Sequence, residues 1–151
     1  MEFEKQLTIA VDFDGTIVEH RYPEIGKEML FAFQTLRELQ AKGHRLILWT
    51  FRHGKALEDA VEYCEQNGVE FFAVNRSFPE EEFDATQESR KIDADLFIDD
   101  RNFGGFPGWG RIWAMIYPDG PNAKPNYQPI YPEDHFNKSN AKPGLFKRLF
   151  R

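Results

Sequence analysis

The stretch Ile9-Ala-Val-Asp-Phe-Asp-Gly-Thr16 decides how the chain is read, because its apolar run stops at two carboxylates and a turn. Apolar residues up to Val11 predict a buried strand, and Asp-Gly indicates a chain reversal. Side chains two apart on a strand project to the same side, so Asp12 and Asp14 emerge together at its carboxyl end. Ligands bind at that edge of an open α/β sheet. Because paired carboxylates repel each other, we expect a cation between them or separate roles on one substrate, with an ordinary turn as the alternative.

Length and composition predict one soluble domain. The chain has 151 residues, 41% of them hydrophobic, and a formal net charge of -6, which argues against non-specific binding to nucleic acid or to an anionic membrane. The single cysteine, Cys64, excludes an internal disulfide and fits a reducing compartment. Neither a signal-peptide pattern nor an apolar run of about 20 residues is present. We therefore expect a cytoplasmic protein that does not enter a membrane.

Strand-like and helix-like segments alternate after Thr16. Apolar periodicity predicts helices and short apolar runs predict strands, and residues 75–91 are polar enough to form a surface loop. The expected helices cover residues 27–42, 54–66 and 110–117, and the later strands residues 45–50, 69–74 and 94–98. Cys64 falls on the apolar stripe of the second helix, which predicts a packing role. The pattern is typical of a three-layer, Rossmann-like α/β fold around a central parallel sheet.

The composition changes at Pro118, and six of the nine prolines, Pro118 included, occur from there onward. Residues 1–117 are therefore expected to form the core domain. Residues 118–151 are expected to form an extended arm that wraps the domain, or a tail.

Further polar residues stand where other predicted strands end or begin. Thr50 closes the second strand and Lys91 precedes the fourth, which Asp99 and Asp100 close. Each has an ordinary explanation by itself, as a strand residue, a solvated lysine or a helix cap. Parallel strands bring their carboxyl ends to one edge, so together these residues predict a site with carboxylates, a hydroxyl donor and a fixed cation.

Three residues near these positions are weaker candidates. Arg52, two residues beyond Thr50, is expected either to bind a substrate phosphate or carboxylate or to be a solvated loop arginine. Arg101 is expected to pair with the acidic residues before it. His20 has no metal-ligand spacing to another histidine and is interpreted as incidental.

The order and approximate spacing of these residues resemble the haloacid dehalogenase superfamily, most of whose members are magnesium-dependent phosphohydrolases. Asp12-Phe-Asp-Gly-Thr16 is similar to its first motif, Thr50 to the second, Lys91 to the third, and Asp99-Asp100 to the fourth. The resemblance covers about residues 7–117. The resemblance implies that the chain has the fold of this superfamily without a substantial cap domain.

The resemblance implies a phosphomonoester hydrolase that works through an aspartyl-phosphate. Asp12 would be the nucleophile, and Asp14 would protonate the leaving alkoxide and then activate water. Thr50 and Lys91 would hold the phosphoryl oxygens.

A magnesium ion is the cofactor that the resemblance implies, since a carboxylate must approach a phosphate dianion. Asp12 and Asp99 would be side-chain ligands, and Asp14 would contribute its backbone carbonyl. Asp100 would be a further ligand or would orient the others.

The substrate is expected to be a phosphorylated small or larger molecule, with no sign of nucleic-acid binding. Without a cap, the site would be open, so a second subunit of a homo-oligomer or the residues after Pro118 would have to cover it. Two alternatives to a phosphatase stay open. One is a non-catalytic module that binds phosphate or metal. The other is a receiver-like phosphoacceptor domain, although the third predicted strand ends in Asn75-Arg76 and lacks the aspartate found there in receivers.

Overall fold

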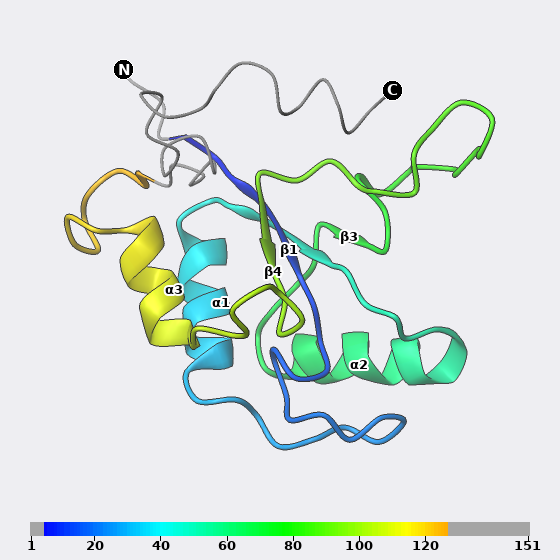
Figure 1. Ribbon diagram of the computed structural model, residues 1–151, viewed down its shortest axis with the longest axis horizontal. Coiled ribbons are helices and arrows are strands. Elements are labelled where there is room, and N and C mark those ends of the chain that lie inside the picture. Colours follow the sequence, from blue (N-terminus) through cyan, green and yellow to red (C-terminus); the bar gives the residue numbers. More distant parts are fainter. Residues whose placement is uncertain (1–4, 127–151) are drawn as a thin grey trace, which may run out of the picture.

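A four-stranded parallel sheet forms the centre of the computed structural model, which describes residues 5–126. The strand order is β3-β2-β1-β4. Figure 1 shows β4 beside β1. The strands are β1 (Thr8–Val11), β2 (Arg45–Leu48), β3 (Ala73–Val74) and β4 (Leu96–Ile98). The helices are α1 (Ala32–Ala41), α2 (Gly54–Gln66) and α3 (Trp109–Ile116). The predicted α/β class with a parallel sheet is confirmed.

Strand β1 lies between β2 and β4, so the chain changes direction across the sheet at β1. Val11 pairs with Leu48 on one side and with Ile98 on the other. The ladder continues one residue further, because the Asp12 N–H donates to the Ile98 carbonyl (2.9 Å). Three strand ends therefore meet where strand order reverses, which is the edge that binds ligands in open α/β sheets.

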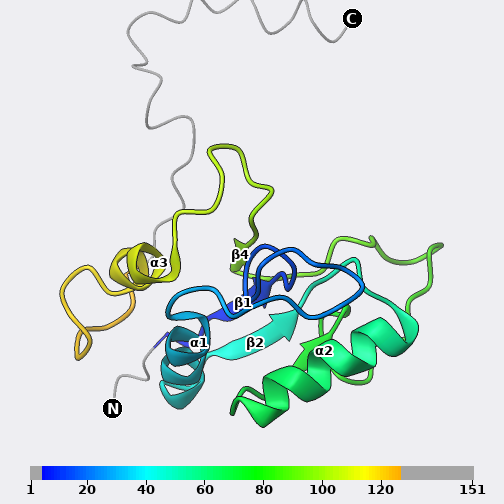
Figure 2. The same cartoon turned by 90° about the horizontal axis from the view of Figure 1, so that it is seen from below.

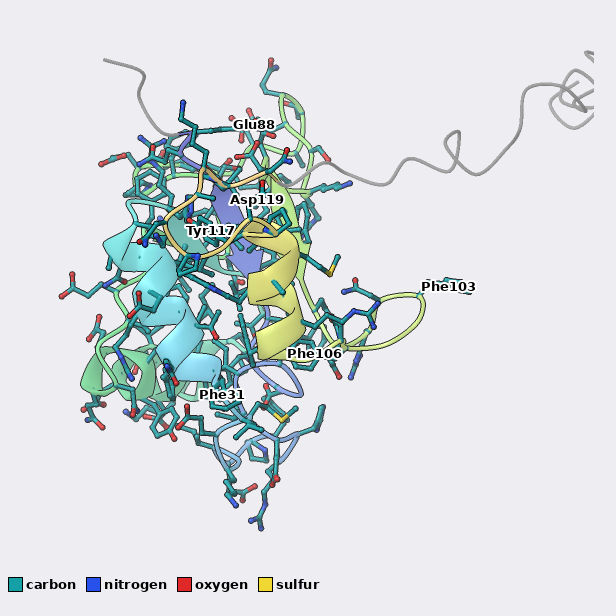
Figure 3. The ribbon with its side chains drawn as sticks, turned by 90° about the vertical axis from the view of Figure 1, so that its left-hand side faces the viewer. Phe31, Glu88, Phe103, Phe106, Tyr117 and Asp119 are labelled. Atoms are coloured by element: carbon teal, nitrogen blue, oxygen red, sulfur yellow. The ribbon has the colours of Figure 1, made fainter. Side chains whose placement is uncertain are left out.

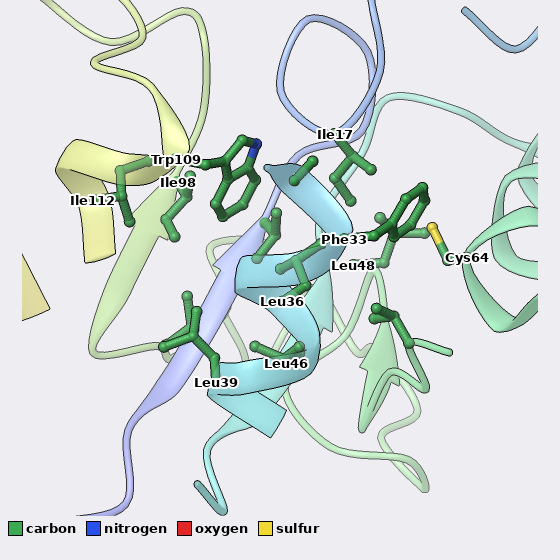
Figure 4. Packing of buried hydrophobic residues seen from close by; sticks show 14 of the residues in the cluster. Ile17, Phe33, Leu36, Leu39, Leu46, Leu48, Cys64, Ile98, Trp109 and Ile112 are labelled. Atoms are coloured by element: carbon green, nitrogen blue, oxygen red, sulfur yellow. The ribbon is translucent and has the colours of Figure 1, made fainter. Parts of the chain in front are cut away.

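All three helices pack on the same face of the sheet (Figure 2). Their buried side chains form one cluster with alternate strand residues such as Ile9 and Leu48. Figure 4 shows Trp109 of α3, Leu36 of α1 and Ile98 of β4 within this cluster. Burial of these apolar faces is the main reason that three short helices are stable here.

The opposite face of the sheet is covered differently from the prediction. Ala10, Ile47 and Ala73 form a smaller cluster there with Ile92, which follows the predicted loop 75–91. Among residues 5–126 no helix lies on this face, so the expectation of three layers is wrong for the described part of the chain. Ile92 covers this face after the loop, and partly buried rings from the strands and their ends, Trp49, Phe72 and Phe97, pack against the same cluster.

The first helix is shorter than predicted, since residues 27–31 do not join it. Phe31 has φ 64°, a left-handed conformation that interrupts a helix. Residues 17–19 instead pair antiparallel with residues 27–29 through Glu19 N–H to Lys27 O (2.7 Å) and Met29 N–H to Ile17 O (2.9 Å). We call this segment the 17–29 hairpin.

The other predicted elements agree more closely. The second helix has its predicted bounds, the third is shifted by one residue, and the third strand shrinks to two residues. Cys64 is buried in the core as expected, and burial raises the pKa of its thiol to about 12, so it stays protonated at neutral pH.

The first residues of the predicted arm return to the domain. Asn126 N–H donates to the Ile116 carbonyl (3.0 Å), and the Lys42 ammonium donates to the Pro121 carbonyl. The remainder of the arm, 127–151, lies outside the described residues. Within residues 5–126, none of the helices is long and apolar enough to cross a bilayer.

Candidate active site

The turn after β1 positions the first two carboxylates. Gly15 has φ 83°, which favours glycine, and a Cβ there would overlap the Asp100 carboxylate. The Asp-Gly pair thus reverses the chain and also lets the loop after β4 approach the turn closely. This close approach requires the glycine of the Asp12–Thr16 motif.

Thr16 connects the turn to the loop after β4, a role that the sequence did not reveal. Its hydroxyl donates to Asp12 Oδ2 (3.4 Å) and accepts from the Asp100 N–H (3.0 Å). Its carbonyl accepts from Trp109 Nε1 (2.8 Å), and the residue is fully buried. Thr16 therefore fixes the spacing between the aspartates of β1 and β4.

Three carboxylates meet at the carboxyl edge as predicted. One oxygen each of Asp12, Asp99 and Asp100 lies within 4.8 Å of the others. Burial raises the pKa of Asp12 to about 7, and repulsion from Asp99, Asp100 and Asp14 adds to the rise. Among the described residues, Asp100 Oδ1 is a buried atom without a hydrogen-bond partner. A hard divalent cation fits this set, which offers only oxygen ligands and lacks a partner for one of them.

The raised pKa of Asp12 predicts how stability depends on pH. Because the folded protein holds a proton that the unfolded chain releases above its ordinary pKa of 3.8, stability should fall between about pH 4 and 7 in metal-free protein. We expect the melting temperature to fall across this range, and Asp12→Asn to flatten the curve. Thermal unfolding in chelator measures both. If the melting temperature of the wild type does not change between pH 4 and 7, and Asp12→Asn has the same pH dependence, then Asp12 is not buried among carboxylates that repel it.

Arg52 holds Asp14 and is unavailable to a substrate. Its Nε and Nη2 donate to the two oxygens of Asp14, both at 2.7 Å. The remaining N–H groups donate to the carbonyls of Glu24 (2.8 Å), Pro23 (2.9 Å) and Ala56 (3.3 Å). All five N–H groups are thereby used. Arg52 lines the cavity, but these contacts give no support to the prediction that it binds a substrate anion. The alternative of a solvated loop arginine is wrong, because the residue is 2% exposed.

The Arg52 guanidinium also stacks between rings. Its central carbon lies 4.8 Å from the centroid of Phe13 and 5.3 Å from that of Tyr22. The arginine thus joins the β1 turn, the 17–29 hairpin and the start of α2. An arginine two residues beyond a strand gave no sequence signal for this role.

Thr50 lies at the site as predicted. Its N–H donates to Asn75 Oδ1 (2.8 Å), and its hydroxyl accepts from the Arg52 N–H (3.2 Å). The hydroxyl hydrogen is therefore free to be donated to an anion. Asn75 also donates to the Arg52 carbonyl (3.5 Å), so it fixes the loop between residues 50 and 52.

A cavity of about 600 Å³ opens over these residues. Of the two positively charged side chains Arg101 and Lys91, only Arg101 is part of its lining. Its lining includes Asp12, Thr50 and Arg101. Lys91 does not line it, and its ammonium instead lies 5.6 Å from the ring centroid of Phe97. The prediction that Lys91 holds phosphoryl oxygens therefore has no support from its position.

Arg101 also differs from expectation. Its backbone N–H donates to Asp99 Oδ1 (2.8 Å), but within residues 5–126 its side chain forms no ion pair with the acidic residues. Its exposed guanidinium lines the cavity. His20 lines the cavity too, although its sequence spacing gave no sign of a role.

Fold and site together define an α/β protein with a parallel four-stranded sheet and three clustered aspartates at its carboxyl edge. No family model matches the chain, and no curated protein matches it. A conserved protein of Bacteroides thetaiotaomicron with a solved structure is 56% identical, with a TM-score of 0.71. The match covers 77% of this chain and 93% of that one. The chain belongs to the family of that conserved protein.

Proposed function

We propose that this protein is a Mg²⁺-dependent phosphomonoester hydrolase with Asp12 as its nucleophile. The observation that carries the proposal is the cluster of Asp12, Asp99 and Asp100, in which one oxygen of each carboxylate lies within 4.8 Å of the others. Among the described residues, Asp100 also has a buried oxygen, Oδ1, without a hydrogen-bond partner. Such a cluster destabilises the fold unless a cation offsets its repulsion. The motif order, which resembles the haloacid dehalogenase superfamily, supports the same reaction.

Asp12 would attack the phosphorus of the ester, forming a bond between its carboxylate oxygen and phosphorus while the ester P–O bond breaks. Water would then attack the same phosphorus, releasing inorganic phosphate and restoring the Asp12 carboxylate. The Thr16 hydroxyl, 3.4 Å from Asp12 Oδ2, orients this carboxylate. The Thr50 hydroxyl can donate to a phosphoryl oxygen.

Asp14 would donate the proton to the leaving oxygen and later accept one from water. Both of its oxygens accept hydrogen bonds from Arg52, so Asp14 has to give up one of these two hydrogen bonds when it is protonated. Arg52 acts through Asp14, by fixing where that proton is held.

The metal would be held by Asp12, Asp99 and Asp100, together with the Asp14 carbonyl. When bound, Mg²⁺ offsets the repulsion between the carboxylates and a phosphate dianion. Oxygen ligands without histidine or cysteine suit Mg²⁺ better than zinc.

A panel of phosphate monoesters tests the proposal. We expect phosphate release with Mg²⁺, its loss in excess EDTA, and its return when Mg²⁺ is added again. Mg²⁺ alone should raise the melting temperature, since the cation binds only the folded cluster. Full activity in EDTA would contradict the metal requirement, and no release from any ester would contradict the reaction.

The cavity lining predicts which cation binds the phosphate. Arg101→Ala should lower kcat/KM about 10²-fold, because within residues 5–126 the Arg101 side chain lines the cavity and forms no ion pair, whereas Arg52 is engaged by Asp14. Arg101→Lys should recover part of this loss. Lys91→Ala is the matched control and should stay close to wild type. The opposite ranking, measured by phosphate release, would return the role to Lys91.

A non-catalytic module that binds phosphate or metal is the second candidate. It is favoured by the engagement of both Asp14 oxygens with Arg52, which a general acid must partly break. This candidate predicts Mg²⁺ binding by calorimetry together with no turnover of any ester.

A further inference from the structure

Aromatic side chains line the same cavity as the aspartates. Tyr22, Trp49 and Phe51 share its wall with Asp12 and Asp14. Tyr22 comes from the 17–29 hairpin, and the other two follow β2. Carboxylates and three aromatic side chains therefore line one cavity, and we call Tyr22, Trp49 and Phe51 the aromatic mouth.

The side chain of Phe51 is exposed to water, and its neighbours in the chain fix the backbone on either side of it. Its side chain is 96% exposed, although the chain on either side of it is fixed. Asn75 bonds to the Thr50 N–H and to the Arg52 carbonyl, and Arg52 itself is buried. A phenyl ring left in water gains nothing from the hydrophobic effect. Its position is thus unexplained by folding.

Tyr22 is also fixed without being covered. The Arg52 guanidinium stacks at 5.3 Å from its ring centroid, yet the residue remains 45% exposed. Because Arg52 is locked by five hydrogen bonds, the Tyr22 ring is set in place before any ligand arrives. A preset ring loses little entropy when a ligand stacks on it.

From these contacts we infer that the aromatic mouth binds a planar aromatic group on the alcohol part of the substrate. The inference rests on the proposed phosphatase function and names its substrate class. Aromatic rings favour offset-stacked or edge-to-face partners beyond what apolar area alone gives, and nucleobases stack on aromatic side chains in the same way. The phosphate lies over the aspartates, and the ring lies at the mouth.

Benzyl phosphate and cyclohexylmethyl phosphate test the inference. Both release a primary alkoxide, so leaving-group chemistry is matched, and they differ in whether the ring is planar. We expect kcat/KM to be about tenfold higher for the benzyl ester. In Phe51→Leu, which keeps an apolar side chain, the ratio should fall, because the variant lacks one of the three rings of the aromatic mouth.

Phe103→Leu is the matched control. Phe103 is also fully exposed, but it extends from the loop before α3 and lines a different cavity (Figure 3). This variant should keep the wild-type ratio. Equal rates for the two esters, a preference for the saturated ring, or a ratio that Phe51→Leu does not change would each overturn the inference.

Binding of substrate analogues tests the aromatic site separately from the phosphatase reaction. Benzylphosphonate and cyclohexylmethylphosphonate, which cannot be hydrolysed, are titrated by calorimetry with Mg²⁺. If neither of these esters nor any ester of the panel is hydrolysed, but the benzyl compound binds more tightly through Phe51, the aromatic site stands and the phosphatase proposal fails. If the esters are hydrolysed but the phosphonates bind equally, the aromatic site fails and the phosphatase proposal stands.

Discussion

Asp12→Asn is expected to lower the rate of phosphate release by about 10⁴-fold or more, because an amide cannot form the acyl phosphate. The same change removes a partly buried charge from beside Asp99 and Asp100, so the metal-free variant should melt at a higher temperature than wild type at pH 8. The two effects have opposite signs, which distinguishes loss of chemistry from loss of folding. Phosphate release and thermal unfolding measure them.

Asp93→Asn provides the control for Asp12→Asn, since Asp93 is exposed and lies away from the cavity. It should change neither measurement appreciably. An Asp12→Asn protein that keeps a tenth of the wild-type rate at saturating Mg²⁺ would show that another group is the nucleophile.

Arg52→Met is expected to lower the free energy of unfolding by about 3–5 kcal/mol, because it leaves the Asp14 carboxylate without its buried partner. The side chains of Arg52 and Asp14 are only 1% and 12% exposed. Arg52→Lys should recover part of the stability, since it restores the charge without the five-donor fork. Urea unfolding measures the change. Adding Asp14→Asn to Arg52→Met should also recover stability, because it removes the unpaired charge.

Lys55 and Asp59 offer a matched ion pair on the surface. Their atoms lie 2.7 Å apart, the same separation as in the Arg52–Asp14 pair, but their side chains are 76% and 44% exposed. Lys55→Met should therefore lower the free energy of unfolding far less than Arg52→Met does, because solvent screens an exposed pair. Equal losses for Lys55→Met and Arg52→Met would mean that burial does not govern the effect of Arg52.

Those parts of the site that depend on strand ends were predictable from the sequence. Asp12, Thr50 and Asp99 each follow an apolar run, and parallel pairing brings such positions to one edge by rule. The roles that depend on side-chain direction were not predictable. Arg52 stands in a loop of the sequence, and it is buried only because its side chain contacts Asp14 and the 17–29 hairpin.

Two other differences between the predictions and the structure have local physical causes. The apolar residues Met29 and Leu30 continue the helical period of α1, but hydrogen bonds of the 17–29 hairpin take the backbone instead. Lys91 follows a loop without periodicity, so nothing in the sequence fixes which way the chain carries it. Its contact with the Phe97 ring became visible only in three dimensions.

The central place of β1 has a consequence for the order in which the protein can be built. Asp12 belongs to the first strand, whereas Asp99 and Asp100 follow the last one. A nascent chain that has left the ribosome only through β3 can pair three strands, yet it carries Asp12 and Asp14 without Asp99 and Asp100, which add to the repulsion on Asp12. Such an intermediate has no complete cation site, and closing the long loop to β4 is an entropically slow step. Cation binding during synthesis would therefore report the arrival of the fourth strand.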